Sequence, residues 1–296
     1  MSLTINHNMM AANTARNLAT SYSKLATSTR RLSSGLRINN AADDAAGLAV
    51  REIMRAEIKS LDQGIRNAND AISMIQTADG ALGVIDEKLI RMKELAMQAS
   101  TGTYSSDQRL IIDSEYQAMA SEITRIANST DFNGIHLLNG NLSGATHSGA
   151  GLVSTGKMKV HFGTGNDSAE DYYYVTINSS TASALGVGLA AASTNGKSIF
   201  TQALAQQALD SLNKAIISKD KIRANLGAMQ NRLQNTITNL SVQAENTQAA
   251  ESNISDVDVA TEMTEFTRQQ ILTQSAVAML SQANGLGKLA MQLIGG

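Results

Sequence analysis

The chain has 296 residues and contains no proline, cysteine or tryptophan, and aromatic residues make up only 3% of it. Because proline breaks helix interiors, its absence from a chain of this length predicts that most of the chain is helical. The lack of cysteine excludes disulfides, thiol catalysis and cysteine-ligated metals, and a formal net charge of −2 does not favour a nucleic-acid partner.

Neither a signal peptide nor a membrane-spanning segment is predicted. The first ten residues, MSLTINHNMM, show no basic stretch followed by an apolar run, so we expect no cleaved Sec-type signal. No run of 18 apolar residues occurs, so we expect no membrane insertion.

Charge is distributed unevenly between the two ends. Residues 1–60 carry eight basic side chains against four acidic ones, and residues 245–296 carry six acidic against two basic. A basic start can indicate a nucleic-acid-binding arm, but such arms are usually disordered and lack an apolar face. Because this start has an apolar face, we expect the two ends to attract one another instead.

The first predicted element is an amphipathic helix. Its apolar stripe alternates spacings of four and three along Ala11, Ala15, Leu18, Tyr22, Leu25, Thr29 and Leu32. Ser33-Ser34-Gly35 and Asn39-Asn40 are turn and cap residues, and they predict a non-helical spoke at about 33–42.

A longer helix with coiled-coil periodicity follows. The same alternation runs through Ile58, Leu61, Ile65, Ala68, Ile72 and Ile75, slips once near Ala78, and resumes through Leu82, Ile85, Leu89, Met92 and Ala96. Thr101-Gly102-Thr103 ends this helix, and Ser105 begins a third one that reaches about Asn128.

The pattern changes between 131 and 197. Asn133-Gly134 and Asn139-Gly140 predict turns, and the segments 157–162 and 172–177 read as strands. We therefore expect a small surface insert between two helical halves.

Two further helices complete the chain, one from about Phe200 to Ala244 and one over about 255–293. The sequence thus predicts a mainly α fold, a long antiparallel helical hairpin or coiled-coil bundle with a small β-containing insert and with its termini side by side.

Several motifs at both ends resemble those of the bacterial flagellins. Near the start they are Arg16-Asn17-Leu18, Arg31-Leu32-Ser33-Ser34-Gly35-Leu36-Arg37-Ile38-Asn39 and Asp43-Asp44-Ala45-Ala46-Gly47-Leu48-Ala49. Near the end they are Leu226-Gly227-Ala228-Met229-Gln230-Asn231-Arg232-Leu233, Asp256-Val257-Asp258-Val259-Ala260-Thr261-Glu262 and Leu280-Ser281-Gln282-Ala283-Asn284. Asp131-Phe132-Asn133-Gly134 falls where the family turns out of its helical domain. The resemblance covers about 1–140 and 200–296.

The resemblance implies a structural subunit that self-assembles into the helical filament for swimming motility. It implies an N-terminal inner-core helix and spoke at 1–42, outer-core helices at 43–140, an outward-projecting variable insert at 141–197, an outer-core helix at 198–252 and a C-terminal inner-core helix at 253–296. Candidate filament-core residues are Leu18, Tyr22, Leu25, Leu32, Met263, Phe266, Leu280, Leu289 and Leu293. The alternative is the hook–filament junction protein of the same secretion family.

The family also implies partners and a location. The partners are further copies of the chain, a flagellar export chaperone, the cap and hook-junction proteins, and the host's Toll-like receptor five. The location is the extracellular filament, reached by type III export. The segment 89–98 resembles the receptor epitope, and the implied recognition residues are Leu89, Arg91, Met92, Leu95, Gln98 and Glu115. We expect Arg91 and Leu95, four residues apart, to point to one face.

Catalytic, cofactor and metal sites are not predicted. Gly196-Lys197-Ser198 fails as a phosphate loop because the earlier glycine position is Ala191. The four histidines form no HExxH pair, and Asp43-Asp44 reads better as a helix start than as a metal or acid–base pair. We therefore expect a protein that is not an enzyme.

Overall fold

The computed structural model describes residues 7–144, 156–168, 170–188 and 197–294, and the side chains of this range up to Gly285. Its helices are α1 (Met9–Ser34), α2 (Ala45–Ser100), α3 (Ser106–Ser129), α4 (Ala182–Leu185), α5 (Gln202–Ser255) and α6 (Val259–Ile294). Its strands are β1 (Asp131–Phe132), β2 (Ile135–His136), β3 (Met158–His161) and β4 (Tyr172–Val175). The mainly α fold with a small β insert is confirmed.

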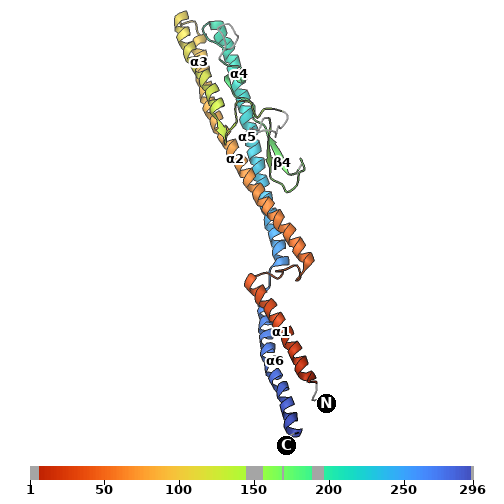
Figure 1. Ribbon diagram of the computed structural model, residues 1–296. Coiled ribbons are helices and arrows are strands. Elements are labelled where there is room, and N and C mark those ends of the chain that lie inside the picture. The colour runs from red at the N-terminus through yellow and green to blue at the C-terminus, as the bar shows by residue number, and fades with distance from the viewer. Residues whose placement is uncertain (1–6, 145–155, 169, 189–196, 295–296) are drawn as a thin grey trace. The chain divides into compact units, whose positions relative to one another are not determined.

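The chain forms two compact units, which are described separately. Unit 1 consists of the chain up to Ile58 and from Glu245 onward, and it holds α1 beside α6 (Figure 1). Unit 2 consists of Lys59–Ala244 and holds most of α2 and α5, together with α3 and the β strands.

The helix ends follow local capping chemistry. The Asn8 side chain accepts a hydrogen bond from the Ala11 amide at the start of α1, and Gly35 ends that helix with a left-handed φ of 72°. The non-helical spoke accordingly occupies 35–44, about two residues later than the sequence indicated. Ser105 and Gln108 form a reciprocal capping box at α3, as the predicted start at Ser105 requires.

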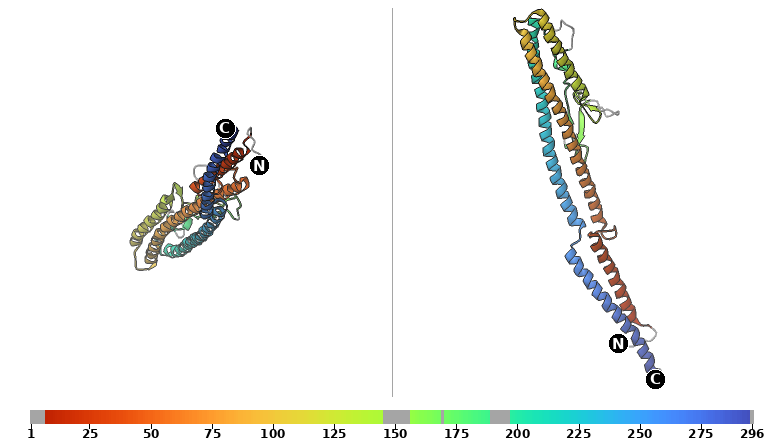
Figure 2. Two further views of the ribbon diagram at one scale, coloured as in Figure 1. Left: turned by 90° about the horizontal axis from the view of Figure 1, so that it is seen from below. Right: turned by 90° about the vertical axis from the view of Figure 1, so that its left-hand side faces the viewer.

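Unit 2 is an antiparallel pair, α2 with α5, that carries a continuous apolar core (Figures 1 and 2). The core side of α2 includes Leu82, Ile85 and Leu89, all fully buried, and Leu212 and Leu226 of α5 pack into the same cluster. The predicted coiled-coil seam of the long helix is therefore confirmed.

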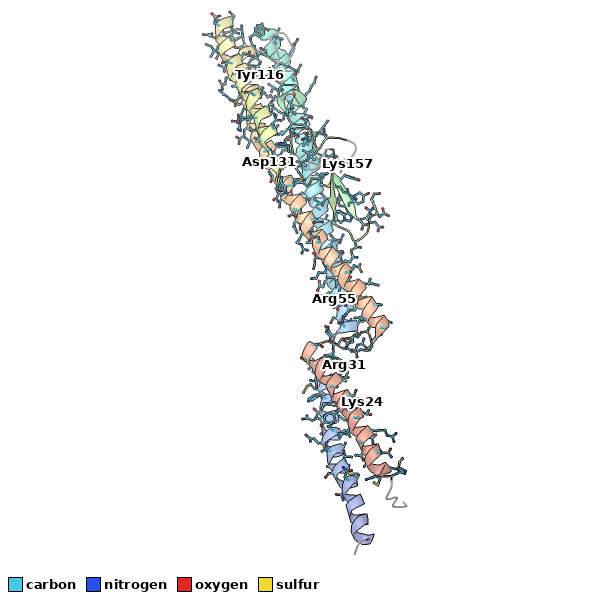
Figure 3. The ribbon with its side chains drawn as sticks, in the orientation of Figure 1. Lys24, Arg31, Arg55, Tyr116, Asp131 and Lys157 are labelled. Atoms are coloured by element: carbon cyan, nitrogen blue, oxygen red, sulfur yellow. The ribbon has the colours of Figure 1, made fainter. Side chains whose placement is uncertain are left out.

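Helix α3 folds back along α2 and adds a buried tyrosine to this core (Figure 3). Tyr116 is fully buried, and burial, assisted by the nearby Asp113 carboxylate, raises the pKa of its hydroxyl. The Asp113 carboxylate accepts hydrogen bonds from the Ser198 hydroxyl and the Ile199 amide, at 3.0 and 2.7 Å. These bonds fix the segment that leads into α5.

Both predicted strand regions exist. At Asn133 and Gly134 the backbone has φ values of 52° and 79°, which a two-residue turn between paired strands requires, and β1 pairs antiparallel with β2 around it. Strand β3 pairs antiparallel with β4, so that His161 lies opposite Tyr172.

The described residues of the insert are not all exposed, and some of them pack on the long helices. Val160, Val175 and Ile177 belong to the same core as α2 and α5. Gly64 of α2 approaches the Phe162 carbonyl so closely that a Cβ there would overlap it, and the Asn67 amide donates to the His161 carbonyl at 2.8 Å. The Arg232 guanidinium of α5 lies 3.6 Å from the centre of the Tyr173 ring. One face of the β3–β4 hairpin is thus docked on the two long helices.

Candidate assembly surface

Helix α6 begins at an acidic cap. The Asp258 carboxylate accepts hydrogen bonds from the Thr261 hydroxyl at 2.7 Å and from the Ala260 amide at 3.0 Å. The Thr261 hydroxyl, with the Thr261 and Ala260 amides, holds the pKa of Asp258 below its usual value. The ionised cap also faces the positive end of the helix dipole, so both effects favour a helix start at this residue.

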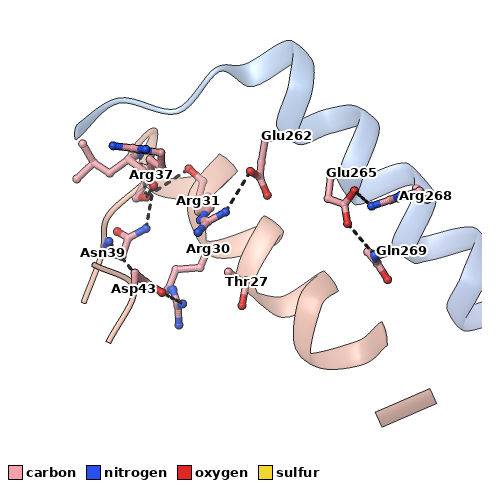
Figure 4. A network of polar contacts seen from close by, with 12 residues as sticks. Thr27, Arg30, Arg31, Arg37, Asn39, Asp43, Glu262, Glu265, Arg268 and Gln269 are labelled. Carbon is pink, nitrogen blue, oxygen red and sulfur yellow. Dashed lines mark hydrogen bonds and ion pairs between the residues drawn. The ribbon is translucent and has the colours of Figure 1, made fainter. Parts of the chain in front are cut away.

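The spoke is bonded to the α5–α6 connection within unit 1 (Figure 4). The Arg37 amide donates to the Ser255 carbonyl at 2.7 Å, and its guanidinium donates to the Ile254 carbonyl at 2.7 and 3.2 Å. The Val257 amide donates to the Gly35 carbonyl at 3.0 Å. These bonds bring the C-terminus of α1 and the N-terminus of α6 together.

Opposite charges meet across α1 and α6, as the charge asymmetry of the ends predicts. Arg31 and Lys24 project from α1 (Figure 3), and the Arg31 guanidinium lies 3.5 Å from the Glu262 carboxylate of α6. Hydrogen bonds from Gln269 and Arg268 hold the pKa of Glu265 below its usual value, and attraction to Lys24 adds to this (Figure 4). The Arg31–Glu262 pair is half-buried and orients the two helices.

The seam between α1 and α6 combines polar residues with half-buried apolar ones. On α1 the half-buried positions Thr14 and Ser21 and the buried Ser28 face the partner helix. On α6 the buried positions include Gln269 and Thr273, which are 3% and 6% exposed. The Thr273 hydroxyl is buried without a hydrogen-bond partner, a state that costs on the order of 1–3 kcal/mol. This seam therefore holds the two helices together only weakly.

Large apolar side chains lie on the outside of the same pair. We call them the outward apolar surface, and its members are Met9, Met10 and Tyr22 of α1 with Val259, Met263, Ile271, Leu272, Val277 and Met279 of α6. Each is between 46% and 61% exposed. So many large apolar side chains exposed on one helix pair indicate a surface that another protein covers.

The predicted filament-core residues divide between the seam of the α1–α6 pair and its outward apolar surface. The half-buried ones on the seam side are Leu18, Leu25, Leu32, Phe266 and Leu280. Tyr22 was expected in the same stripe, but it is 52% exposed and points outward with Met263, because Ser21 takes the seam position. The side chains of Leu289 and Leu293 lie outside the described residues.

Sequence reasoning missed Leu272, Val277 and Met279 as candidate assembly residues. A search for an apolar stripe assumes that apolar side chains face the partner helix within the chain. Here Gln269 and Thr273 take buried positions and Ala276 a half-buried one, between the half-buried Phe266 and Leu280. The regular spacing of these small and polar residues, four and then three apart, is the signal that identifies the seam side and leaves Leu272, Val277 and Met279 off it.

Three of the implied receptor-recognition residues on α2 do not lie at the surface. Leu89 and Met92 are fully buried and Leu95 is 2% exposed, so these three side chains pack in the core of unit 2. Although Arg91 and Leu95 are four residues apart, the Arg91 side chain is exposed to solvent, whereas the Leu95 side chain packs in the core.

The polar members of the epitope do meet. The Arg91 guanidinium donates to Glu115 of α3 at 2.8 and 3.0 Å and to Glu94 at 3.0 Å. The hydrogen bonds to Glu115 and then Glu94 raise the pKa of Arg91. Gln98 donates to the Tyr104 hydroxyl at 3.1 Å. We call Arg91, Glu94, Gln98 and Glu115 the charged patch.

An open groove adjoins the charged patch and adds apolar side chains that the sequence analysis did not single out. Its lining includes Ile90, Lys93, Met97 and Tyr104. Ile90 and Met97 are 48% and 55% exposed. The groove and the patch together form a mixed surface on unit 2.

Neither a metal site nor a membrane span emerges from the described ranges. There, no three histidine or acidic side chains come together as metal ligands would. Among the described helices, none combines the length and apolar character needed to cross a bilayer.

Comparisons with known proteins give consistent matches over both helical ends. The bacterial flagellin N-terminal helical region matches residues 5–143, and the bacterial flagellin C-terminal helical region matches 207–294. A flagellin of Halalkalibacterium halodurans is 42% identical over 98% of this chain and 99% of its own length. Flagellin FlaB2 of Treponema pallidum is 41% identical over the same shares of the two chains. The crystal structure of Bacillus cereus flagellin matches 63% of this chain and 94% of its own, with 29% identity and a TM-score of 0.46.

Proposed function

Since the chain belongs to the bacterial flagellin family, we propose that it polymerises into the flagellar filament through the outward apolar surface of α1 and α6. The observation that carries the proposal is the number of large apolar side chains that this pair exposes, beside a seam that buries polar residues as well as apolar ones. Burying that surface against neighbouring copies removes apolar area from water, which drives association. The filament role is preferred to the junction role because relatives named flagellin span nearly the whole chain.

The test is polymerisation of variants on the exposed side of α6. Ile271→Asn and Met279→Asn should reduce salt-induced filament formation at least tenfold, measured by sedimentation and electron microscopy. Gln270→Asn and Gln274→Asn are matched controls, because they place the same residue on exposed positions without removing apolar surface. Filaments at the control level from both apolar variants would refute the proposal.

Family membership also supports proposals for the export route and for partners. We propose that the chain leaves the cell through the flagellar type III route without Sec cleavage. We further propose that an export chaperone covers the C-terminal helix before assembly, and that the cap and hook-junction proteins meet the same ends. The exposed apolar side chains of α6 support the need for such cover in the unassembled chain. A secreted protein shortened by Sec-type cleavage, detected by intact mass, would refute the route.

We also propose that Toll-like receptor five recognises the monomer through the charged patch and its groove. Arg91 presents a directional cation held by two carboxylates, with Ile90 and Met97 as apolar neighbours. A few such anchors dominate binding at protein interfaces. Leu89, Met92 and Leu95 act only indirectly, by supporting the helix that carries the patch.

A receptor-reporter assay tests this second proposal. Arg91→Ala should weaken activation by monomer, and cross-linked filament should be less potent than monomer. Arg125→Ala is the matched control, because Arg125 also forms an exposed ion pair on unit 2, with Glu122. Full potency of Arg91→Ala, or equal potency of monomer and filament, would contradict the proposal.

A further inference from the structure

A lysine occupies a core position in the seam between α2 and α5. The buried or half-buried seam positions of α5 are spaced by three or four residues, with one break in the alternation at Leu233–Ile237. They are Ala205, Ala208, Leu212, Ala215, Lys219, Ile222, Leu226, Met229, Leu233, Ile237, Leu240 and Ala244. Lys219 is the one charged member of this described series and is 1% exposed.

The charge of Lys219 is met from α2. Its ammonium lies 2.5 Å from the Asp86 carboxylate and 2.8 Å from that of its neighbour Asp220. One turn further along α5, the Arg223 guanidinium lies 2.7 Å from the Asp79 carboxylate. Two cations of α5 therefore meet two carboxylates of α2 that are seven residues, one heptad, apart.

The apolar seam by itself does not define a unique register. All seam positions of α5 except Lys219 are Leu, Ile, Met or Ala. Sliding α5 along α2 by one heptad therefore again brings apolar residues opposite apolar residues. Such a slip displaces one helix by about 10 Å along the other, because seven residues each rise about 1.5 Å.

Only the observed register pairs both cations. In an antiparallel pair, a slip in one direction brings Lys219 opposite Asp79 and leaves Arg223 opposite the apolar Ile72. A slip in the other direction brings Arg223 opposite Asp86 and places Lys219 opposite Lys93, which is also positive. The first alternative leaves Arg223, whose side chain is 38% exposed, without a carboxylate of α2. In the second, the buried Lys219 keeps only Asp220 of its own helix as a partner and faces a like charge, which is costly in a core.

We propose that Lys219, with Asp86, is a positioning residue that fixes the register of α2 and α5 for assembly, and Arg223 with Asp79 supports it. The same two helices also supply residues 45–58 and 245–255 of unit 1, and Ile254 and Ser255 at the end of α5 accept the bonds from the spoke. A buried polar residue at a single seam position is known to specify register at some cost in stability. The assembly part rests on the proposed function, whereas the register part does not.

The test measures register directly in the monomer. Because the chain has no cysteine, Gln76→Cys and Gln243→Cys, two exposed positions of α2 and α5, accept spin labels at these sites alone. Lys219→Met should add a second distance population, displaced by about 10 Å for a one-heptad slip. The same variant should keep or raise the melting temperature while forming fewer filaments. If Lys219 only stabilised the fold, Lys219→Met would instead lower the melting temperature and leave a single distance between the two labels.

Two further variants complete the experiment. Lys214→Met makes the same change at an exposed position of α5 and should keep the single wild-type distance. The exchange of Asp86→Lys with Lys219→Glu should restore that single distance and filament formation. A single wild-type distance in Lys219→Met, or no rescue by the exchange, would overturn the proposal. Wild-type protein that fails to polymerise while the distances behave as expected would count against the proposed function alone.

Discussion

Individual side chains on α2 divide sharply between core and surface. Leu95 is 2% exposed, whereas Ile90, five residues earlier, is 48% exposed. A substitution at Leu95 therefore acts on folding first, and a substitution at Ile90 acts on whatever contacts the groove.

Leu95→Ala should lower the free energy of unfolding of the monomer by about 2–5 kcal/mol, since it removes buried methylene groups and leaves a cavity. Ile90→Ala is the comparison on the same helix and should change it by about 0.5 kcal/mol or less, as exposed substitutions do. Urea unfolding of both variants checks this. Equal destabilisation would contradict the burial assigned to Leu95.

The acidic cap of α6 should respond to pH in one direction. The folded pKa of Asp258 lies below the value of 3.8 for the free side chain. Its contribution is therefore fully present above pH 3.8 and is lost as the pH falls through the lower folded value.

Asp258→Ala should accordingly speed hydrogen exchange of the Ala260 and Thr261 amides at pH 6 and have no effect once the carboxyl of the wild type is protonated. Thr267→Ala, a change at an exposed position nine residues beyond Asp258, should leave the exchange of these amides unaffected. Exchange measured by NMR at both pH values checks this. An undiminished difference between variant and wild type well below the folded pKa would refute the assigned cause.

Among the elements, the long helices were predictable and the two sides of α1 and α6 were not. The seam of α2 is regular enough that Leu61, Leu82 and Leu89 reveal both its period and its inward face. In α6, Phe266 and Leu280 lie on the seam side, whereas Leu272, Val277 and Met279 are exposed. A sequence pattern reports that a face is apolar but not whether the chain itself or another copy covers it.

The β3–β4 hairpin shows a second limit of sequence reasoning. Alternation predicted its strands correctly, but its docking depends on Gly64, about a hundred residues earlier, and on the Phe162 carbonyl that approaches it. A glycine inside a helix carries no sign of which distant backbone needs the space.

Gly64→Ala should detach or displace the hairpin, because the added Cβ overlaps the Phe162 carbonyl. Gly80→Ala on the same helix has open space and should stabilise the protein by about 1 kcal/mol through helix propensity. Thermal unfolding and limited proteolysis of the 163–171 loop distinguish the two. A Gly64→Ala variant as stable and as protease-resistant as Gly80→Ala would contradict the docking.

At the scale of the whole molecule, the two units differ in what holds them together. Unit 2 has a continuous apolar core that includes Leu82, Leu212 and Tyr116. Unit 1 joins α1 and α6 through buried polar residues such as Ser28, Gln269 and Thr273. We therefore expect assembly with other copies to stabilise unit 1 more than unit 2.

Methionine oxidation measures the central claim most directly, because the chain carries its own probes on both kinds of surface. Met263 and Met279 are 46% and 57% exposed on the outward apolar surface, while Met74 and Met92 are fully buried in unit 2. Peroxide oxidises accessible methionines to sulfoxides that mass spectrometry locates. In the monomer, Met263 and Met279 should oxidise readily and Met74 and Met92 slowly. In the filament, Met263 and Met279 should become protected at least tenfold, and oxidation of these two at the monomer rate would contradict the account.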